Sequence, residues 1–309
     1  MRAADPKALV ERALDGDRGA LAKLLSVVEA GGDNARVAAS LLHPHTGRAW
    51  SIGITGAPGA GKSTLTDRLV SRIRADGPEV GVLAVDPSSP FSGGAILGDR
   101  VRMQDHATDA GVFIRSMASR GHLGGLAVAT PQSLRVLDAV GKPWIVVETV
   151  GVGQVEVEIA GHADTTVVVV NPGWGDAVQA AKAGLLEIAD VFVVNKADRP
   201  GASETVRDLE GMLELAGTIP WRPPIVRTVA TTGEGIDEFW AAIRQHRAHM
   251  EEGDRLARRR HERIAAEVRA IVAEQLLVRA GEQCRGPAFD ALVDRVAART
   301  LDPYQAADE

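Results

Sequence analysis

The sequence predicts a doubly wound α/β domain with a mostly parallel sheet and helical extensions at both ends of the chain. Seven short apolar runs punctuate the middle of the chain, and they lack the apolar/polar alternation of half-solvated strands. Two of these runs, at 144–147 and 167–170, are almost continuously apolar and rich in β-branched residues. This composition is typical of strands that helices bury on both faces, as in a parallel sheet.

Strands and helices are expected to alternate along the chain. The strands are predicted at 50–55, 80–85, 112–114, 144–147, 165–170, 191–194 and 225–229. Helices are predicted between them at 63–74, 123–140, 177–188 and 203–215, where apolar residues recur at helical spacing. This alternation indicates βαβ units, which we place in a central domain at 48–250.

The two ends of the chain differ from this central domain. Residues 1–47 are predicted to be a helical extension, in which Leu21, Leu24 and Leu25 follow a helical spacing. Residues 251–309 are predicted to be a second one, with dense charge and an apolar stripe from Ile264 to Leu277. Such a stripe packs on its own domain, on another copy of the chain or on a partner.

Charge and cysteine content exclude several classes of protein. The chain has 35 Lys and Arg against 41 Asp and Glu, for a net charge of -6, which argues against a nucleic-acid-coating surface or a polybasic membrane anchor. The basic run at 255–263 is therefore interpreted as a solvated helix face. The single cysteine, Cys284, excludes an intrachain disulfide framework.

Membrane and export signals are also missing from the sequence. No apolar run reaches the roughly 18 to 20 residues of a membrane span. The first residues carry charges where a signal peptide needs an apolar segment. We expect a cytoplasmic protein with no membrane or nucleic-acid partner.

The strongest motif directly follows the first expected strand and opens the next helix. It fits the pattern G-x-x-x-x-G-K-[ST] at every fixed position, with Gly56, Ala57, Pro58, Gly59, Ala60, Gly61, Lys62 and Ser63. A strand before it and a helix after it are the context of a phosphate-binding P-loop. The glycines let backbone N–H groups surround a β-phosphate, while Lys62 supplies positive charge and Ser63 a hydroxyl ligand for Mg²⁺. Together with Thr64, these residues form the predicted phosphate site.

Two acidic residues end later strands of the predicted sheet. Asp86 and Glu148 are expected at its carboxyl edge, where α/β proteins bind ligands. Each would hold Mg²⁺ directly or through water, or else only cap the next helix. The longer side chain of Glu148 reaches a metal-bound water more easily than the ion itself.

The segment from Glu148 to Gly151 is similar to the D-x-x-G switch of GTPases, with Glu in place of Asp. The N–H of Gly151 is the natural donor to a γ-phosphate. Asp99 is the only acid of the polar loop at 87–102, and it is the candidate to position the hydrolytic water or the metal shell. Because no Gln directly follows Gly151, we expect hydrolysis to be slow without a partner.

A second motif, Asn195-Lys196-Ala197-Asp198, follows the sixth expected strand and fits N-K-x-D. Its Asp198 carboxylate is expected to accept hydrogen bonds from guanine N1–H and N2–H₂, which adenine does not offer. Asn195 orders the loop, and the Lys196 stem covers the base. After the seventh strand, Ala230 and Thr231 are expected to supply a backbone N–H to guanine O6. The two motifs together predict a guanine-specific GTPase that binds GTP or GDP with Mg²⁺.

The chain resembles the MeaB/ArgK-type GTPases, which include the human methylmalonic aciduria type A protein. The resemblance rests on GAPGAGKSTL, VDPSSP, GGAILGDRVRM, NKAD, DPYQAA and above all ETVGVGQ, in which most GTPases have Asp for Glu. It implies a GTP-hydrolysing chaperone that gates adenosylcobalamin loading and protects or reactivates methylmalonyl-CoA mutase. It also implies a homodimer held by the C-terminal extension, and the adenosyltransferase of the mutase as a further partner.

Other functions fit the sequence less well. A nucleotide-dependent kinase or ATPase linked to amino-acid transport predicts tolerance of adenine, against which Asp198 discriminates. A GTPase that serves a related acyl-CoA mutase shares every motif named above.

Overall fold

The structure is a computed structural model, and it describes residues 5–87, 106, 108–119, 125–149, 162–173, 188–215, 217 and 219–309. The chain divides into two compact units, Met1–Arg263 and Ile264–Glu309. Helix α11 (Arg255–Gln283) begins in the first unit and continues into the second.

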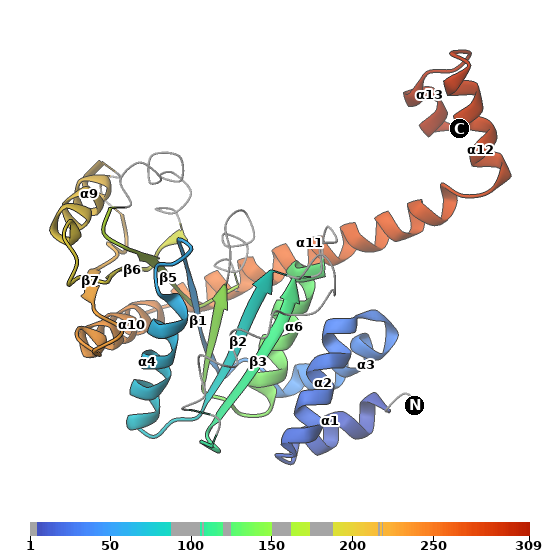
Figure 1. The fold of residues 1–309 in the computed structure, drawn as a ribbon. Coiled ribbons are helices and arrows are strands. Elements are labelled where there is room, and N and C mark those ends of the chain that lie inside the picture. The colour runs from blue at the N-terminus through green and yellow to red at the C-terminus, as the bar shows by residue number, and fades with distance from the viewer. Residues whose placement is uncertain are drawn as a thin grey trace. The chain divides into compact units, whose positions relative to one another are not determined.

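A seven-stranded parallel sheet forms the centre of the first unit (Figure 1). The strands are β1 (Trp50–Gly56), β2 (Val80–Pro87), β3 (Val112–Ser119), β4 (Trp144–Thr149), β5 (Thr165–Val170), β6 (Val191–Asn195) and β7 (Ile225–Thr228). Their spatial order is β3-β2-β4-β1-β5-β6-β7, and each neighbouring pair is parallel. Every residue of β1, β4, β5 and β6 is buried. The doubly wound α/β class is therefore confirmed.

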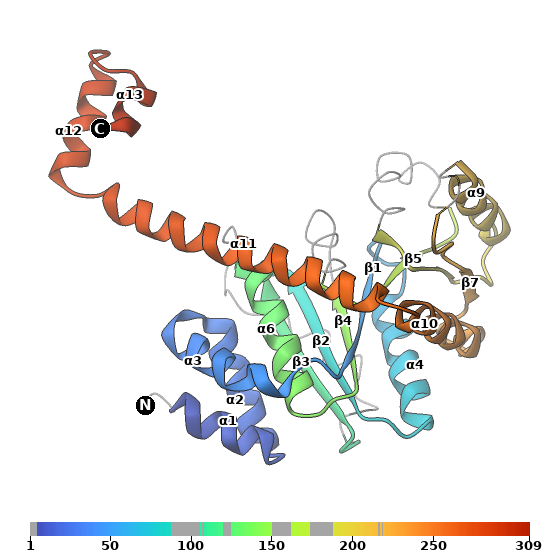
Figure 2. The ribbon, with the colours of Figure 1, turned by 180° about the vertical axis from the view of Figure 1, so that it is seen from behind.

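Helices cover both faces of the sheet, as the opposite views of Figures 1 and 2 show. The helices that pack on it are α4 (Lys62–Ala75), α6 (Gly125–Ala139), α9 (Ala202–Leu215) and α10 (Ile236–Glu251). One face packs against α4 and α10, whose Leu69 and Phe239 are buried in one apolar cluster with Ile52 of β1. The other face packs against α6 and α9. Because all neighbouring strands are parallel, their carboxyl ends lie at one edge of the sheet.

Three N-terminal helices lie over α6. They are α1 (Pro6–Leu14), α2 (Arg18–Ala30) and α3 (Gly32–Leu42), followed by a 3₁₀ turn at His43–His45. The Asp17 carboxylate caps α2 by accepting hydrogen bonds from the N–H groups of Gly19 and Ala20. Leu24 and Leu25 are fully buried in the same apolar cluster as Leu137 of α6. The helical character predicted for the N-terminal extension is observed.

The second unit consists of the remainder of α11, α12 (Pro287–Ala297) and α13 (Pro303–Asp308). The carboxyl-terminal residue Glu309 contacts α12, since the Arg295 guanidinium donates to the Glu309 carboxylate with an Nη2–Oε1 distance of 3.0 Å.

Among the described residues of the whole chain, no helix is long and apolar enough to cross a membrane.

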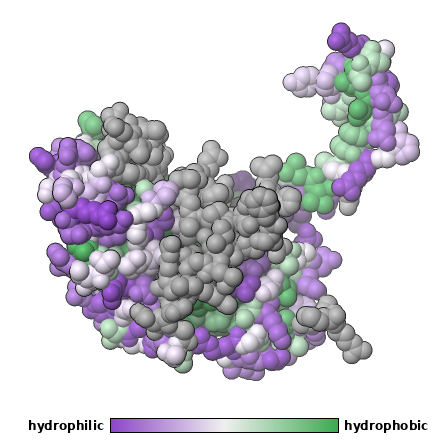
Figure 3. All heavy atoms as spheres, in the orientation of Figure 1, coloured by the Kyte–Doolittle hydropathy of each residue, from purple (hydrophilic) through white to green (hydrophobic). Residues whose placement is uncertain are grey.

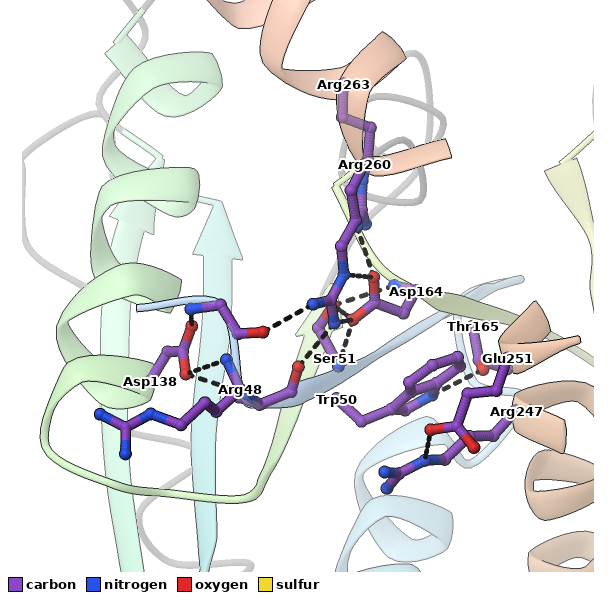
Figure 4. Close-up of polar contacts among 12 residues, drawn as sticks. Arg48, Trp50, Ser51, Asp138, Asp164, Thr165, Arg247, Glu251, Arg260 and Arg263 are labelled. Carbon is purple, nitrogen blue, oxygen red and sulfur yellow. Dashed lines mark hydrogen bonds and ion pairs between the residues drawn. The ribbon is translucent and has the colours of Figure 1, made fainter. Parts of the chain in front are cut away.

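Three arginines join the first turns of α11 to the amino-terminal edge of the sheet. Figure 4 shows two of them, Arg260 and Arg263, beside Asp164. Arg260 donates to both oxygens of Asp164 at 3.0 and 2.9 Å, and Arg263 pairs with the same carboxylate. Arg259 donates to both oxygens of Asp190 at 3.0 and 2.8 Å. The interpretation of residues 255–263 as a solvated face is therefore wrong for these three. Their acids immediately precede β5 and β6, far away in the sequence.

The buried Asp164 carboxylate of this cluster has a lowered pKa. Its burial by itself would raise the pKa, but the hydrogen bond from Arg260 and the charges of Arg263 and Arg260 outweigh it. The pKa of Asp164 is lowered to about 2. The carboxylate also accepts a hydrogen bond from the N–H of Ser51 at 3.0 Å, so it links α11 to the start of β1 as well as β5.

The depressed pKa of Asp164 predicts a specific loss of stability in acid. Because the unfolded chain binds this proton more tightly, the stabilisation is complete above about pH 4 and is lost as the pH falls towards 2. We expect Asp164 to account for about 2 kcal/mol of the fall in unfolding free energy over this interval. Urea unfolding at a series of pH values measures it, with Asp164→Asn as the test variant.

The exposed Asp33, whose side chain is 99% accessible, provides the control. Asp33→Asn should retain the full acid-dependent loss. An Asp164→Asn protein whose unfolding free energy depends on pH as steeply as that of the wild type would contradict this assignment.

Candidate functional site

The P-loop lies between the carboxyl end of β1 and the first turn of α4. At two positions of this loop only glycine fits, because the backbone has a positive φ and a Cβ atom would come too close to a neighbouring segment. A Cβ at Gly56, with φ 136°, would lie 2.0 Å from the carbonyl oxygen of Val169. A Cβ at Gly61, with φ 88°, would lie 2.4 Å from Nδ2 of Asn195. The loop is thus held tightly between β5 and the segment that follows β6.

Lys62 begins α4, and its side chain turns back under the loop. Its Nζ donates to the carbonyl oxygens of Gly56 at 2.6 Å and of Ala57 at 3.1 Å. The residue is only 7% exposed, so its charge is held inside the loop rather than in solvent. A buried ammonium beside a helix N-terminus attracts an anion such as a phosphate group.

Ser63 and Glu148 are brought together from α4 and β4. The Ser63 hydroxyl donates to Oε1 of Glu148 at 2.6 Å, and both residues are buried. Glu148 is placed by the register of the sheet, where it pairs with Ile54 of β1 and Ala84 of β2. The structure therefore joins two of the three predicted metal ligands.

The other predicted switch and metal residues are only partly described. The backbone of Asp86 lies at the carboxyl end of β2, in register with Ala118 of β3, and its side chain lies outside the described residues. Asp99 and Gly151 also lie outside the described residues.

Asn195 connects the P-loop to the two loops after β6 and β7. It is 2% exposed, and its Nδ2 donates to the carbonyl oxygen of Ala60 at 2.8 Å. Its Oδ1 accepts hydrogen bonds from Thr228 Oγ1 and from Ala230 N–H, both at 3.1 Å. A single amide thus orders all three segments, and it uses both its donor and its acceptor to do so.

Lys196 and Asp198 continue the same loop with different environments. Lys196 has a φ of 56°, unusual for a residue with a side chain, and its Nζ donates to the carbonyl oxygen of Gly59 at 2.6 Å. The long side chain therefore crosses from the loop after β6 to the P-loop. Asp198 is exposed, so its carboxylate is open to a ligand.

The turn after β7 is closed by a bridge between Val229 and Glu234. Ala230 is buried and Thr231 is exposed within it. Arg68 of α4 donates from Nε to the carbonyl oxygen of Ala230 at 3.1 Å and from Nη2 to that of Thr231 at 3.2 Å. Arg68 was not predicted as a site residue, because its spacing on α4 does not distinguish it from other charged residues of that helix.

All these groups gather at the carboxyl edge of a parallel sheet, the usual ligand site of such folds. The P-loop follows β1, Glu148 ends β4, and the Asn195 and Ala230 segments follow β6 and β7. In the described ranges, no group of three or more His, Cys, Asp or Glu side chains is placed to hold a metal ion. A metal bound by Ser63 and Glu148 would therefore also need oxygen ligands from a nucleotide or water.

Comparison with known proteins gives one family and several relatives. The family described as methylmalonyl-CoA mutase-associated GTPase MeaB matches residues 21–284. A relative from Pyrococcus horikoshii is 52% identical over 304 residues, which cover 97% of this chain and 95% of that protein. The mouse protein named methylmalonic aciduria type A homolog, mitochondrial, is 35% identical over 233 residues, 73% of this chain and 56% of that protein.

Among solved structures, a protein described as LAO/AO transport system kinase is similar over the full length. It has 26% sequence identity and a TM-score of 0.72, and the match covers 100% of this chain and 97% of that one. The fold and the order of its elements are thus shared along the chain.

Proposed function

Since the chain belongs to the MeaB family of methylmalonyl-CoA mutase-associated GTPases, we propose that it is a GTP-hydrolysing chaperone of a cobalamin-dependent acyl-CoA mutase. In this role it gates the loading of adenosylcobalamin and protects or reactivates the mutase. The observation that carries the proposal is the match over residues 21–284 to a family described by its mutase. The mouse relative, named for methylmalonic aciduria, supports the same client.

The nucleotide is held by groups from three loops. The P-loop N–H groups, including that of Thr64, and the Lys62 ammonium bind the phosphates, while Asp198 accepts hydrogen bonds from guanine N1–H and N2–H₂. Asn195 fixes the distance between these two parts of the site, because it bonds to Ala60 on one side and to Ala230 on the other. Lys196 lies along the base and contacts Gly59.

The site suits a magnesium ion bound with the nucleotide. Mg²⁺ takes oxygen ligands, usually one or two from the protein together with phosphates and water, and the Ser63 hydroxyl and the Glu148 carboxylate are such a pair. Asp86, at the end of the neighbouring strand, is the third proposed ligand. When bound, the ion would neutralise charge on the β- and γ-phosphates.

Hydrolysis is proposed to depend on a partner. Gly151 would donate its N–H to the γ-phosphate, and Asp99 would position the attacking water. No Gln directly follows Gly151, the place where small signalling GTPases have the residue that orients this water. The intrinsic reaction would then be slow until the client completes the site.

The test is phosphate release under multiple turnover, measured with and without an adenosylcobalamin-dependent mutase from the same organism. We expect slow release from the protein alone and an acceleration of at least about tenfold with the mutase. Lys62→Ala supplies the background rate. A rate of phosphate release that saturating mutase leaves unchanged would rule out the proposed chaperone cycle. The client is identified by comparing the rates with methylmalonyl-CoA mutase and with related acyl-CoA mutases. The adenosyltransferase is added last.

A transport-linked kinase is the second candidate, because the similar solved structure carries that description. A kinase transfers the phosphoryl group to an acceptor, whereas a GTPase releases it as inorganic phosphate. Retention of the γ-phosphate on this chain or on a transport component would favour the kinase.

The C-terminal extension is proposed to hold a homodimer. Within the second unit, a stripe along α11 exposes large apolar side chains, with Ile264, Val268 and Val272 each about half accessible and Leu276 58% accessible. Figure 3 shows hydrophobic residues gathered on this unit. A stripe of this kind on a charged helix is typical of a surface that a second helix covers.

We expect Val268→Glu with Val272→Glu to convert a dimer into a monomer. Both side chains are exposed on the single chain, so the substitution costs little in its own stability but places charge in the proposed interface. Light scattering coupled to size exclusion measures the mass. The matched control is Ala266→Glu with Ala270→Glu on the opposite side of α11, which should remain dimeric; equal masses for the two variants would contradict the proposed interface.

A further inference from the structure

We propose that Arg68 is a positioning residue for guanine recognition, acting on the backbone of the turn after β7. This inference rests on the proposed reading of the base by that turn and by Asp198. Arg68 lies on α4, the helix whose first residue is Lys62. Its guanidinium spans two successive carbonyl oxygens, those of Ala230 and Thr231, at 3.1 and 3.2 Å.

The contact fixes the direction of one particular N–H group. The carbonyl of Ala230 and the N–H of Thr231 belong to the same planar trans peptide, so they point in opposite directions. With its carbonyl held by Arg68 on α4, this peptide directs the Thr231 N–H away from that helix. Arg68 therefore sets the orientation of a donor that it does not touch.

The neighbouring N–H groups of the turn are already used. The Ala230 N–H donates to Oδ1 of Asn195 at 3.1 Å. The N–H groups of Thr232 and Gly233 both donate to the carbonyl oxygen of Val229, at 3.0 and 2.9 Å. Within this turn, Thr231 thus offers the N–H that the folded chain leaves for guanine O6.

The hydrogen bonds that Arg68 makes within the described part of the chain both go to main-chain oxygens. Arg72, one turn further along α4, instead pairs with the carboxylates of Asp76 and Asp237. A bidentate guanidinium is well suited to holding two successive carbonyl groups, because its two donors are fixed in one plane. Arg72 makes a matched control on the same helix, with ion pairs that do not involve the turn.

The arrangement also couples the two ends of the nucleotide. The first turn of α4 carries Lys62 and Ser63 at the phosphates, and its second turn carries Arg68 at the base. This helix therefore sets, together with Asn195, the separation between the phosphate site and the O6 donor. This role predicts a loss of affinity that depends on O6 and on no other atom of the base.

The experiment measures the affinities of three diphosphates by calorimetry. GDP and IDP both carry O6, whereas 2-aminopurine riboside diphosphate lacks it. Arg68→Met removes the donors and keeps the apolar stem, and we expect it to weaken GDP and IDP about tenfold each. It should change the affinity for the 2-aminopurine nucleotide less than about twofold. Arg68→Lys, which keeps the charge but loses the planar pair of donors, should weaken GDP and IDP by an intermediate factor. Arg72→Met should leave all three affinities unchanged.

The outcomes separate this inference from the proposed function. Equal weakening of all three nucleotides by Arg68→Met would show a merely structural role and overturn the inference, as would unchanged GDP affinity. A wild-type protein that binds ADP as tightly as GDP would instead overturn the base reading on which the inference rests.

Discussion

Replacement of Lys62 by alanine is expected to lower the affinity for GTP and GDP by at least about a hundredfold and to abolish turnover. Lys62 is the cation buried within the P-loop, where its Nζ already bonds to the carbonyls of Gly56 and Ala57. An alanine at this position leaves the phosphates without that charge. Fluorescence titration with a labelled GDP measures the loss.

Lys142→Ala is the matched control for Lys62→Ala. Lys142 is also a partly covered lysine, paired with Glu79 on the same unit, and it does not belong to the nucleotide site. Its substitution should leave GDP affinity within about twofold of wild type. A Lys62→Ala protein that bound GDP normally would show that the phosphates bind elsewhere.

Replacement of Asp198 by asparagine is expected to exchange guanine for xanthine preference. The carboxylate accepts two hydrogen bonds from guanine, whereas an amide presents a donor that matches the 2-oxo group of xanthine. We expect GTP affinity to fall by roughly a hundredfold or more while XTP affinity rises above it. Competition between GTP and XTP for the variant measures the exchange.

Because Asp198 is exposed, its substitution should change nucleotide binding without changing the stability of the fold. An exposed side chain contributes little to folding, so the stability of the variant should stay within about 0.5 kcal/mol of wild type. Asp208→Asn, at an exposed position on α9, controls for the loss of one surface charge. Unchanged GTP affinity in Asp198→Asn would show that the base is read by other groups.

The fold could be predicted well because its main signals are local. The continuous β-branched run at 167–170 is buried on both faces in β5, as its composition indicated. The helices expected at 63–74 and 203–215 are observed as α4 and α9, to within a residue at each end. Strand order could not be predicted in the same way, because it depends on pairing between distant segments.

The site could be predicted where the motif itself sets the geometry. The proximity of Ser63 and Glu148 was expected, since both follow from a P-loop and a strand end at one edge of the sheet. The role of Arg68 was not expected, because its partners are main-chain carbonyl groups, which the sequence does not single out. Arg260 was misinterpreted for a related reason: a basic run looks solvated until Asp164, about a hundred residues earlier, is placed beside it.

We infer that this site selects guanine nucleotides through the P-loop and the Asn195–Asp198 loop together. Parallel calorimetric titrations of the wild-type protein with GTP and with ATP, both with Mg²⁺, test it most directly. We expect GTP to bind at least about a hundredfold more tightly than ATP, because adenine offers Asp198 no pair of donors. Equal affinity for the two nucleotides would contradict it.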